Sequence, residues 1–212
     1  MTSIVQRFKN IKSLINNSNV KIIAVSKTFT YEKIKPLVDY GHTHFGENKV
    51  QEAQVKWTEV KKNNQDLKLH MIGKLQSNKA KEAVHLFDYI HSVDTPKLAN
   101  LLSKHENNIN KKIKYFIQVN LLKEKQKTGV GTDTLDDFFY HCTKDLNMNV
   151  IGLMAIPPND GQENTHFKNL MELNQSFGLK DLSMGMSGDF KEALKYDTTF
   201  VRIGSSIFGK RF

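Results

Sequence analysis

The stretch Lys21-Ile22-Ile23-Ala24-Val25-Ser26 (KIIAVS) is apolar at nearly every position, which is typical of a β-strand buried on both faces. Residues 31–40 follow with helical periodicity; Thr30 is placed to cap that helix and Gly41 to end it. Buried strands that alternate with helices are typical of a parallel sheet. The stretch therefore indicates an α/β protein.

The same alternation recurs along the rest of the chain. Seven further strands are expected at residues 42–46, 68–72, 89–93, 113–120, 150–156, 182–186 and 200–203, and helices at 49–62, 78–87, from Pro96 onward, and at 135–146, 163–177 and 189–196. Eight such units predict a TIM-type (β/α)8 barrel, although the pattern also fits an open doubly wound sheet. Neither GxGxxG nor GxxxxGK(S/T) follows any strand, which weakens the nucleotide-binding alternative.

Length and composition predict one domain, residues 1–212, with no internal repeat and no flexible linker. Residues 1–17 read as an extra amphipathic helix before the first strand; polar residues interrupt its apolar stripe. Such a helix is neither a signal peptide nor a membrane span. The single Cys142 cannot form an internal disulfide, which suits a reducing cytoplasm. No His/Cys cluster has ligand spacing, so no metal site is expected.

The formal charge of +9 raises the question of nucleic-acid binding. Of the 31 basic residues, all except Arg7, Arg202 and Arg211 are Lys, and they are scattered over the expected helix faces. Specific recognition of bases and phosphates favours the planar fork of Arg and a basic stripe interleaved with aromatics. We therefore expect a solvated lysine-rich surface and no nucleic-acid partner. The positive field would still attract small phosphorylated anions.

One lysine stands where a barrel of this type places its chemistry. Active sites of such barrels lie at the C-terminal ends of the strands, and Lys27 directly follows the first strand. A lysine at that rim can lose solvation, release its proton more easily and form a Schiff base with an aldehyde. On position alone, an ordinary surface lysine at a strand end is the more common interpretation.

Two Gly/Ser-rich loops close the chain, after the seventh and eighth strands. The first holds Ser187 and Gly188, ahead of a helix; the second begins Gly204-Ser205-Ser206. Loops at these positions often bind phosphate, which needs closely approaching N–H groups and hydroxyl donors. Two ordinary turns would give the same pattern.

Other polar residues lie in or after the expected strands. Glu47, in the FGEN stretch at 45–48, could line a pocket or cap a helix. His70, within an apolar strand, is expected to be a hydrogen-bonded core residue rather than an acid or base. The lysine-rich run at 123–127 is expected to be a solvated loop.

Taken together, these stretches resemble the pyridoxal phosphate homeostasis proteins, one-domain relatives of the alanine racemase N-terminal barrel. The matching motifs are AVSKT at 24–28, FGEN at 45–48, IGKLQSNK at 72–79, HSVD at 91–94, GLMAIP at 152–157, SMGMS at 183–187 and VRIGSSIFG at 201–209. They follow the family's order over nearly the whole chain, and as a set they are highly specific.

The resemblance implies a pyridoxal 5′-phosphate (PLP) site. Lys27 matches the lysine that holds the cofactor as a Schiff base. Arg202 matches the arginine that faces the pyridine nitrogen, and Asn48 a residue that lines the cofactor. The matches around the cofactor phosphate are Ser187, Gly204 and Ser205, where the family often has Thr in place of Ser205. Met184 and Met186 are expected to flank the same pocket.

The resemblance also implies a restrained function. We expect a cytoplasmic monomer that stores PLP or delivers it to apo-enzymes, rather than an enzyme. Alanine racemase has a second, β-rich domain with a catalytic tyrosine, whereas this sequence ends at Phe212, directly after the last expected strand. The alternatives are a PLP-dependent amino-acid racemase and, from a different class, a lysine-rich nucleic-acid-binding barrel.

Overall fold

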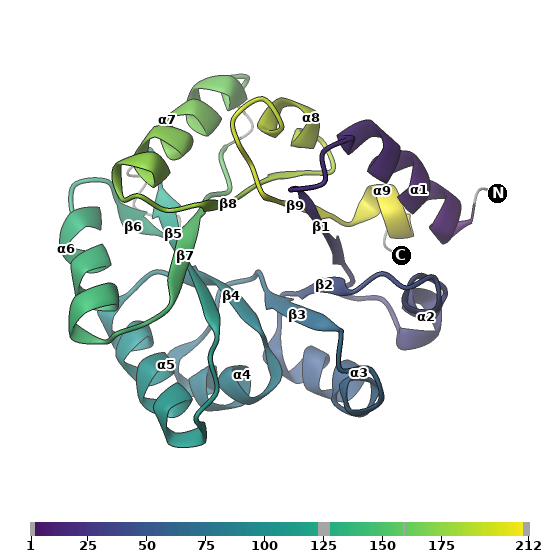
Figure 1. The fold of residues 1–212 in the computed structure, drawn as a ribbon, viewed down its shortest axis with the longest axis horizontal. Coiled ribbons are helices and arrows are strands. Elements are labelled where there is room, and N and C mark those ends of the chain that lie inside the picture. Colours follow the sequence, from purple (N-terminus) through teal and green to yellow (C-terminus); the bar gives the residue numbers. More distant parts are fainter. Residues whose placement is uncertain (1–2, 123–127, 159, 210–212) are drawn as a thin grey trace.

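Eight parallel strands form a closed ring in the centre of the molecule (Figure 1). The computed structural model describes residues 3–122, 128–158 and 160–209; the run at 123–127 lies outside the described residues. The ring consists of β1 (Lys21–Val25), β2 (His44–Glu47), β3 (Lys68–Met71), β4 (Tyr89–Val93), β5 (Lys114–Asn120), β7 (Val150–Met154), β8 (Asp181–Met186) and β9 (Phe200–Ile203). It closes because β1 pairs with β9 and β4 pairs with β5. The TIM-type barrel is therefore confirmed, and the open sheet is excluded.

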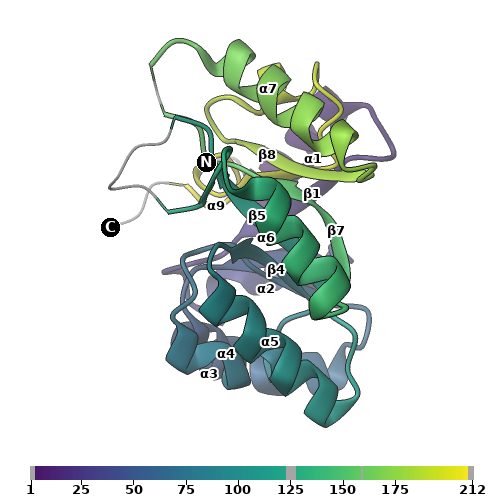
Figure 2. The same cartoon turned by 90° about the vertical axis from the view of Figure 1, so that its left-hand side faces the viewer.

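Helices cover the outside of the ring, and Figure 2 shows α5, α6 and α7 side by side over the strands. The helices are α1 (Ile4–Ile15), α2 (Tyr31–Asp39), α3 (Val50–Asn63), α4 (Ala80–Leu86), α5 (Pro96–Ile109), α6 (Leu135–Tyr140), α7 (Glu163–Ser176), α8 (Phe190–Ala193) and α9 (Ser205–Phe208). Across the described ranges, no helix combines the length and the apolar run needed to cross a membrane.

The expected N-terminal helix is present as α1. It begins after Ser3, whose Oγ accepts a hydrogen bond from the Gln6 N–H and so caps the first turn. Its apolar side packs inward, and Arg7 Nε donates to the Ile207 carbonyl of α9 at 2.6 Å. The helix thereby links the start of the chain to the segment after the last strand, as Figure 1 shows.

The structure differs from the expected elements mainly in short segments. The helix expected at 135–146 is α6 followed by a π-helical turn, η2 (His141–Asp145), and the helix expected at 189–196 ends at Ala193. A 3-10 turn, η1 (Ser77–Lys79), precedes α4. The four-residue helix α9 and the two-residue strand β6 (Val130–Gly131), which pairs with β5, are not predicted from the sequence. Segments this short contain too few residues to show a hydrophobic period.

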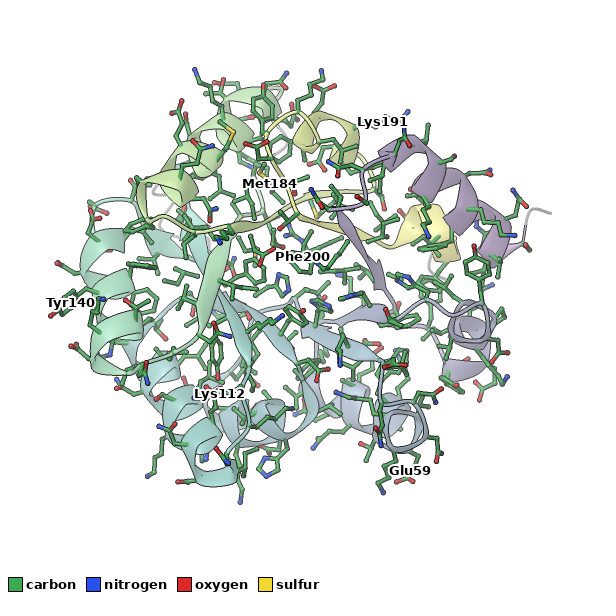
Figure 3. All side chains as sticks on the ribbon, in the orientation of Figure 1. Glu59, Lys112, Tyr140, Met184, Lys191 and Phe200 are labelled. Carbon is green, nitrogen blue, oxygen red and sulfur yellow. The ribbon has the colours of Figure 1, made fainter. Side chains whose placement is uncertain are left out.

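Alternation along the strands divides the core into two parts. Most buried apolar side chains lie between the ring and the helices. A separate cluster fills the barrel interior and consists of Ile23, Val25, Ile72, Tyr89, Phe116, Met154 and Phe200. Figure 3 shows Phe200 inside the ring. The barrel is therefore a packed core, and a ligand can be received only at its ends.

Gly152 shows how closely two strands approach each other. A Cβ added at this position would lie 1.8 Å from the Asp181 carbonyl oxygen on β8 and 2.9 Å from the Phe116 ring. Only glycine fits between them, because the obstacle is partly backbone, which cannot turn aside.

Candidate functional site at the C-terminal end of the barrel

Five of the sequence-predicted residues meet at the C-terminal end of the barrel. Strands β2, β1, β9 and β8 are consecutive neighbours in the ring. Their C-terminal ends lead directly into the predicted residues, which are Asn48, Lys27, Gly204, Ser205 and Ser187. Because all the strands are parallel, these residues lie at one end of the molecule. The ring thus joins segments from both ends of the chain at one rim.

Lys27 is half-buried and occupies a constrained turn. The residue before it, Ser26, is fully buried, and its N–H donates to the Gly46 carbonyl of β2 at 2.9 Å. The residue after it, Thr28, has a φ of 68°, a region that β-branched residues rarely adopt. The Thr28 N–H donates to the Glu52 carboxylate of α3, which holds this backbone conformation.

A buried ion-pair cluster supports that turn. Glu47 Oε1 accepts hydrogen bonds from Ser26 Oγ at 2.7 Å, Trp57 Nε1 at 2.8 Å and Lys56 Nζ at 2.9 Å. Lys56 Nζ also donates to the Ser26 carbonyl at 2.8 Å and to Glu52 at 3.0 Å. Lys56 is therefore held by two carboxylates, and it fixes the residue that precedes Lys27.

The sequence pattern does not predict this cluster. From the pattern, Glu47 is expected to line a pocket or to cap a helix. In the structure its side chain is fully buried and accepts three hydrogen bonds through one oxygen. A signal is present in the sequence, because Glu52 and Lys56 stand one helical turn apart in α3. The spacing alone does not predict that the Glu52–Lys56 pair faces the C-terminal end of β1.

The two Gly/Ser loops contact each other directly. The Gly204 N–H donates to Ser187 Oγ at 3.2 Å, which joins the loop after β9 to the loop after β8. Gly204 is buried, Ser187 is half-buried and Ser205 is exposed. Ser205 begins α9, and the first N–H groups of a helix have no acceptor within it. The loops thus present hydroxyl and N–H donors close together.

Arg202 lies in β9 with its guanidinium buried inside the barrel, 4% exposed. Its Nη1 donates to the Ser183 carbonyl at 2.9 Å and to Ser183 Oγ at 2.8 Å, and its Nη2 donates to the Ala155 carbonyl at 2.9 Å. Burial lowers the pKa of Arg202 to about 10, so the group remains a cation near neutral pH. These hydrogen bonds use at most three of the five N–H groups, so among the described residues donors on Nε and Nη2 are left for a ligand.

Asn48 is half-buried at the end of β2, and its Oδ1 is a buried acceptor without a hydrogen-bond partner in the described part of the chain. Gly73 packs against its backbone, since a Cβ added at Gly73 would lie 2.6 Å from the Asn48 carbonyl oxygen. A hollow of about 510 Å³ opens beside Asn48 and is also lined by Met71 and Lys74.

The two methionines occupy different environments. Ser183 of β8 faces the barrel interior, so alternation turns the Met184 side chain to the outside, where it is fully buried among the residues between ring and helices. Figure 3 shows Met184 on this outer side of β8. Met186 is half-buried and lines a second rim hollow of about 510 Å³, together with Gly188 and Asp189. The Met184 side chain therefore supports β8 from behind.

The fold and the arrangement of these residues define a (β/α)8 barrel with a lysine after its first strand and a buried arginine on its last. Residues 1–211 match the family model described as alanine racemase, N-terminal domain, and the chain belongs to this family. No group of three or more His, Cys, Asp or Glu side chains suited to a metal ion occurs in the described part.

Relatives of similar length carry a more specific name. The chain is 37% identical over 202 residues to the pyridoxal phosphate homeostasis protein of Synechocystis sp., covering 91% of this chain and 92% of the relative. It is 35% identical to the protein of the same name from Vibrio cholerae, covering 100% and 98%.

Solved structures agree with the fold. The structure of PipY from Synechococcus elongatus PCC7942 with PLP bound has a TM-score of 0.90 and 33% identity, covering 98% of this chain and all of that one. An alanine racemase from Clostridium difficile has a TM-score of 0.77 at 13% identity, covering 99% of this chain and 57% of that one, and shows the shared fold alone.

Proposed function

We propose that this chain binds pyridoxal 5′-phosphate through Lys27 and takes part in its homeostasis, holding and delivering the cofactor rather than catalysing a reaction with it. The observation that carries the proposal is the meeting of Lys27, Ser187, Gly204 and Arg202 at one end of three neighbouring strands. An amine, a set of phosphate donors and a buried cation are thereby combined in one site.

The hydrogen-bond donors and acceptors of these residues match those of the cofactor. The unpartnered Oδ1 of Asn48 is an acceptor, and the remaining N–H groups of Arg202 are donors, that a polar aromatic ligand would satisfy. The Gly204 N–H is donated to Ser187 Oγ, so the donors left for a phosphate are the Ser187 hydroxyl proton and the N–H groups that begin α9 at Ser205. We assign Met184 a supporting position behind these groups.

Each residue then has a distinct task. PLP supplies an aldehyde that condenses with amines, and a ring that withdraws electrons most strongly when its nitrogen is protonated. Lys27 provides the amine, and the Glu47–Lys56 cluster holds the backbone on which it stands. Arg202, a cation with no proton acceptor, would disfavour protonation of the ring nitrogen and thus restrain the electron-withdrawing power of the ring. The same restraint would suit a racemase, so Arg202 does not by itself distinguish a carrier from an enzyme.

The remaining features of the proposal concern the whole molecule. We place residues 1–212 in one binding domain that acts as a monomer in the cytoplasm. The thiol of Cys142 is fully buried and burial raises its pKa to about 12, so it is a poor nucleophile. Light scattering of the purified protein measures its molar mass in solution. The mass of a dimer would contradict the proposed monomer.

The first experiment is an absorbance titration with PLP. Wild-type protein is expected to develop the long-wavelength band that PLP acquires when its aldehyde joins an amine, and Lys27→Ala is expected to lack it. Lys49→Ala is the matched control, because Lys49 is an exposed lysine at the same rim. A wild-type protein without the band at saturating PLP, or equal loss in both variants, would contradict the assignment of Lys27.

Two further measurements separate a carrier from an enzyme. The loaded protein is expected to reactivate an apo PLP-dependent enzyme faster than PLP is released into solution. Failure to transfer cofactor to any apo-enzyme would contradict delivery. Steady interconversion of D- and L-amino acids that depends on Lys27 would contradict the non-enzymatic assignment.

A further inference from the structure

Three histidines on neighbouring strands form a continuous row through the barrel interior. His44 Nδ1 lies 2.9 Å from His70 Nε2, and His70 Nδ1 lies 2.9 Å from His91 Nε2. The row continues across the barrel, because His91 Nδ1 lies 2.9 Å from Ser183 Oγ on β8. Ser183 Oγ is also the acceptor for Nη1 of Arg202. We call His44, His70 and His91 the histidine row.

The histidine row begins at the N-terminal end of the ring and continues into the buried interior. His44 is the first residue of β2, at the N-terminal end of the ring, and it is half-buried. His70, His91 and Ser183 are fully buried in the interior. His70 stacks on Tyr89 with ring centroids 4.2 Å apart, and His91 stacks on Phe116 at the same distance. Aromatic walls therefore hold both rings in place.

The histidine row consists of neutral rings. Burial lowers the pKa values of His70 and His91 well below the ordinary histidine value; neighbouring His91 and His44 add to the effect at His70, and Arg202 adds to it at His91. A neutral imidazole carries one proton and leaves its other nitrogen as an acceptor. Each ring can therefore donate one hydrogen bond and accept one, so all the hydrogen bonds of the row must point in the same direction.

The arginine sets that direction. A guanidinium only donates, so Ser183 Oγ accepts from Arg202 and has one proton of its own to give. If that proton goes to His91 Nδ1, then His91 donates from Nε2 to His70, and His70 donates from Nε2 to His44. In the opposite direction Ser183 would accept two hydrogen bonds, and its own buried proton would lack an acceptor within the described residues. The buried protons of Ser183, His91 and His70 all have acceptors only when these hydrogen bonds point away from Arg202, toward the half-buried His44.

We propose that the histidine row is a positioning device for Arg202, in which His91 accepts the Ser183 proton and so keeps the Ser183 hydroxyl turned as an acceptor for the guanidinium. The row thereby fixes the orientation of the Arg202 guanidinium, and with it the N–H groups that are left for the bound cofactor. This inference rests on the proposed function, because it assigns the row a task at the PLP site. Packing alone would need only the ring shapes, not the hydrogen bonds.

The test compares variants that remove the hydrogen bonds in different ways. His91→Phe keeps a ring to stack on Phe116 but accepts nothing from Ser183. His91→Asn can still accept through its amide oxygen, and Ser183→Ala removes the hydroxyl itself. The measurements are the dissociation constant for PLP, the absorbance maximum of the loaded protein, and the ¹⁵N shifts of the histidine rings without PLP.

We expect His91→Phe to bind PLP roughly ten- to hundred-fold more weakly, as loss of one charge-assisted hydrogen bond predicts, and to shift the absorbance maximum. His91→Asn should lie much closer to wild type in both the affinity for PLP and the absorbance maximum. The double variant His91→Phe/Ser183→Ala should be little worse than either single variant, because both act through one hydroxyl. The ¹⁵N shifts of unloaded wild type should place the protons of His70 and His91 on Nε2.

Other results would overturn the inference. It fails if His91→Phe folds and matches wild type in affinity and absorbance, if the two substitutions add independently, or if the ¹⁵N shifts show protons on Nδ1 or charged rings. Should His91→Phe not fold, Ser183→Ala and the ¹⁵N shifts decide alone. Absence of PLP binding by wild type would refute the proposed function, while the ring shifts would still report on the direction of the row.

Discussion

Replacement of Lys56 by methionine tests the ion-pair cluster that supports Lys27. The Lys56 side chain is 6% exposed and that of its partner Glu47 is 0% exposed, with 2.9 Å between the charged atoms. Lys56→Met keeps most of the side-chain volume but leaves a buried carboxylate without its cation. Breaking a buried pair in this way costs about 3–5 kcal/mol, a large part of the stability of a domain.

Urea unfolding followed by tryptophan fluorescence measures this loss. The chain has a single tryptophan, Trp57, which donates to the same Glu47 oxygen, so the probe lies inside the cluster. The double variant Lys56→Met/Glu47→Gln removes both charges and is expected to recover part of the loss. A free energy of unfolding for Lys56→Met within about 1 kcal/mol of wild type would refute the reasoning, because a buried charge would then need no counter-ion.

Three further predictions follow from single features. Gly152→Ala should destabilise the fold by about 3 kcal/mol or more, since the new Cβ meets the Asp181 backbone, whereas Gly188→Ala, with no atom within 4 Å of the new group, should be nearly neutral in the same urea experiment. Burial lowers the pKa values in the histidine row, to about 4 at His44, so the folded state binds fewer protons than the unfolded chain below the ordinary value of 6.5. Stability should therefore fall as the pH falls from 6.5 toward 4, by up to about 1.4 kcal/mol per pH unit and histidine, and an unchanged melting temperature over this range would contradict the neutral rings. Ser187→Ala should weaken binding of PLP several-fold but leave binding of pyridoxal, which lacks the phosphate, unchanged; equal weakening of both would argue against a phosphate contact.

The sequence predicts the barrel because its strands are buried on both faces. Continuous apolar runs such as residues 21–26 stand out against the helices, and each of the eight has a counterpart in the ring. Only their order is visible in the sequence, since closure between β1 and β9 is a tertiary contact. The ends of the elements are less predictable, because local turns such as η2 depend on packing.

The candidate site is predictable only in part. Lys27 and the Gly/Ser loops can be placed at the rim from their positions after strands. The histidine row cannot be found in this way, because each histidine, taken alone, looks like a core residue on its own strand. His70 is indeed hydrogen-bonded in the core, as expected, but its partners become visible only when three strands lie in register.

The pairing of β1 with β9 means that the proposed site needs both the first and the last strand of the barrel. Lys27 leaves the ribosome early and Arg202 late, so the amine exists long before the cation and the phosphate loop that accompany it. A nascent chain stalled before β9 cannot form the β1–β9 pairing and therefore has no complete site. Retention of the cofactor would then distinguish finished molecules from fragments, and a circular permutant with new ends on the far side of the ring should retain it.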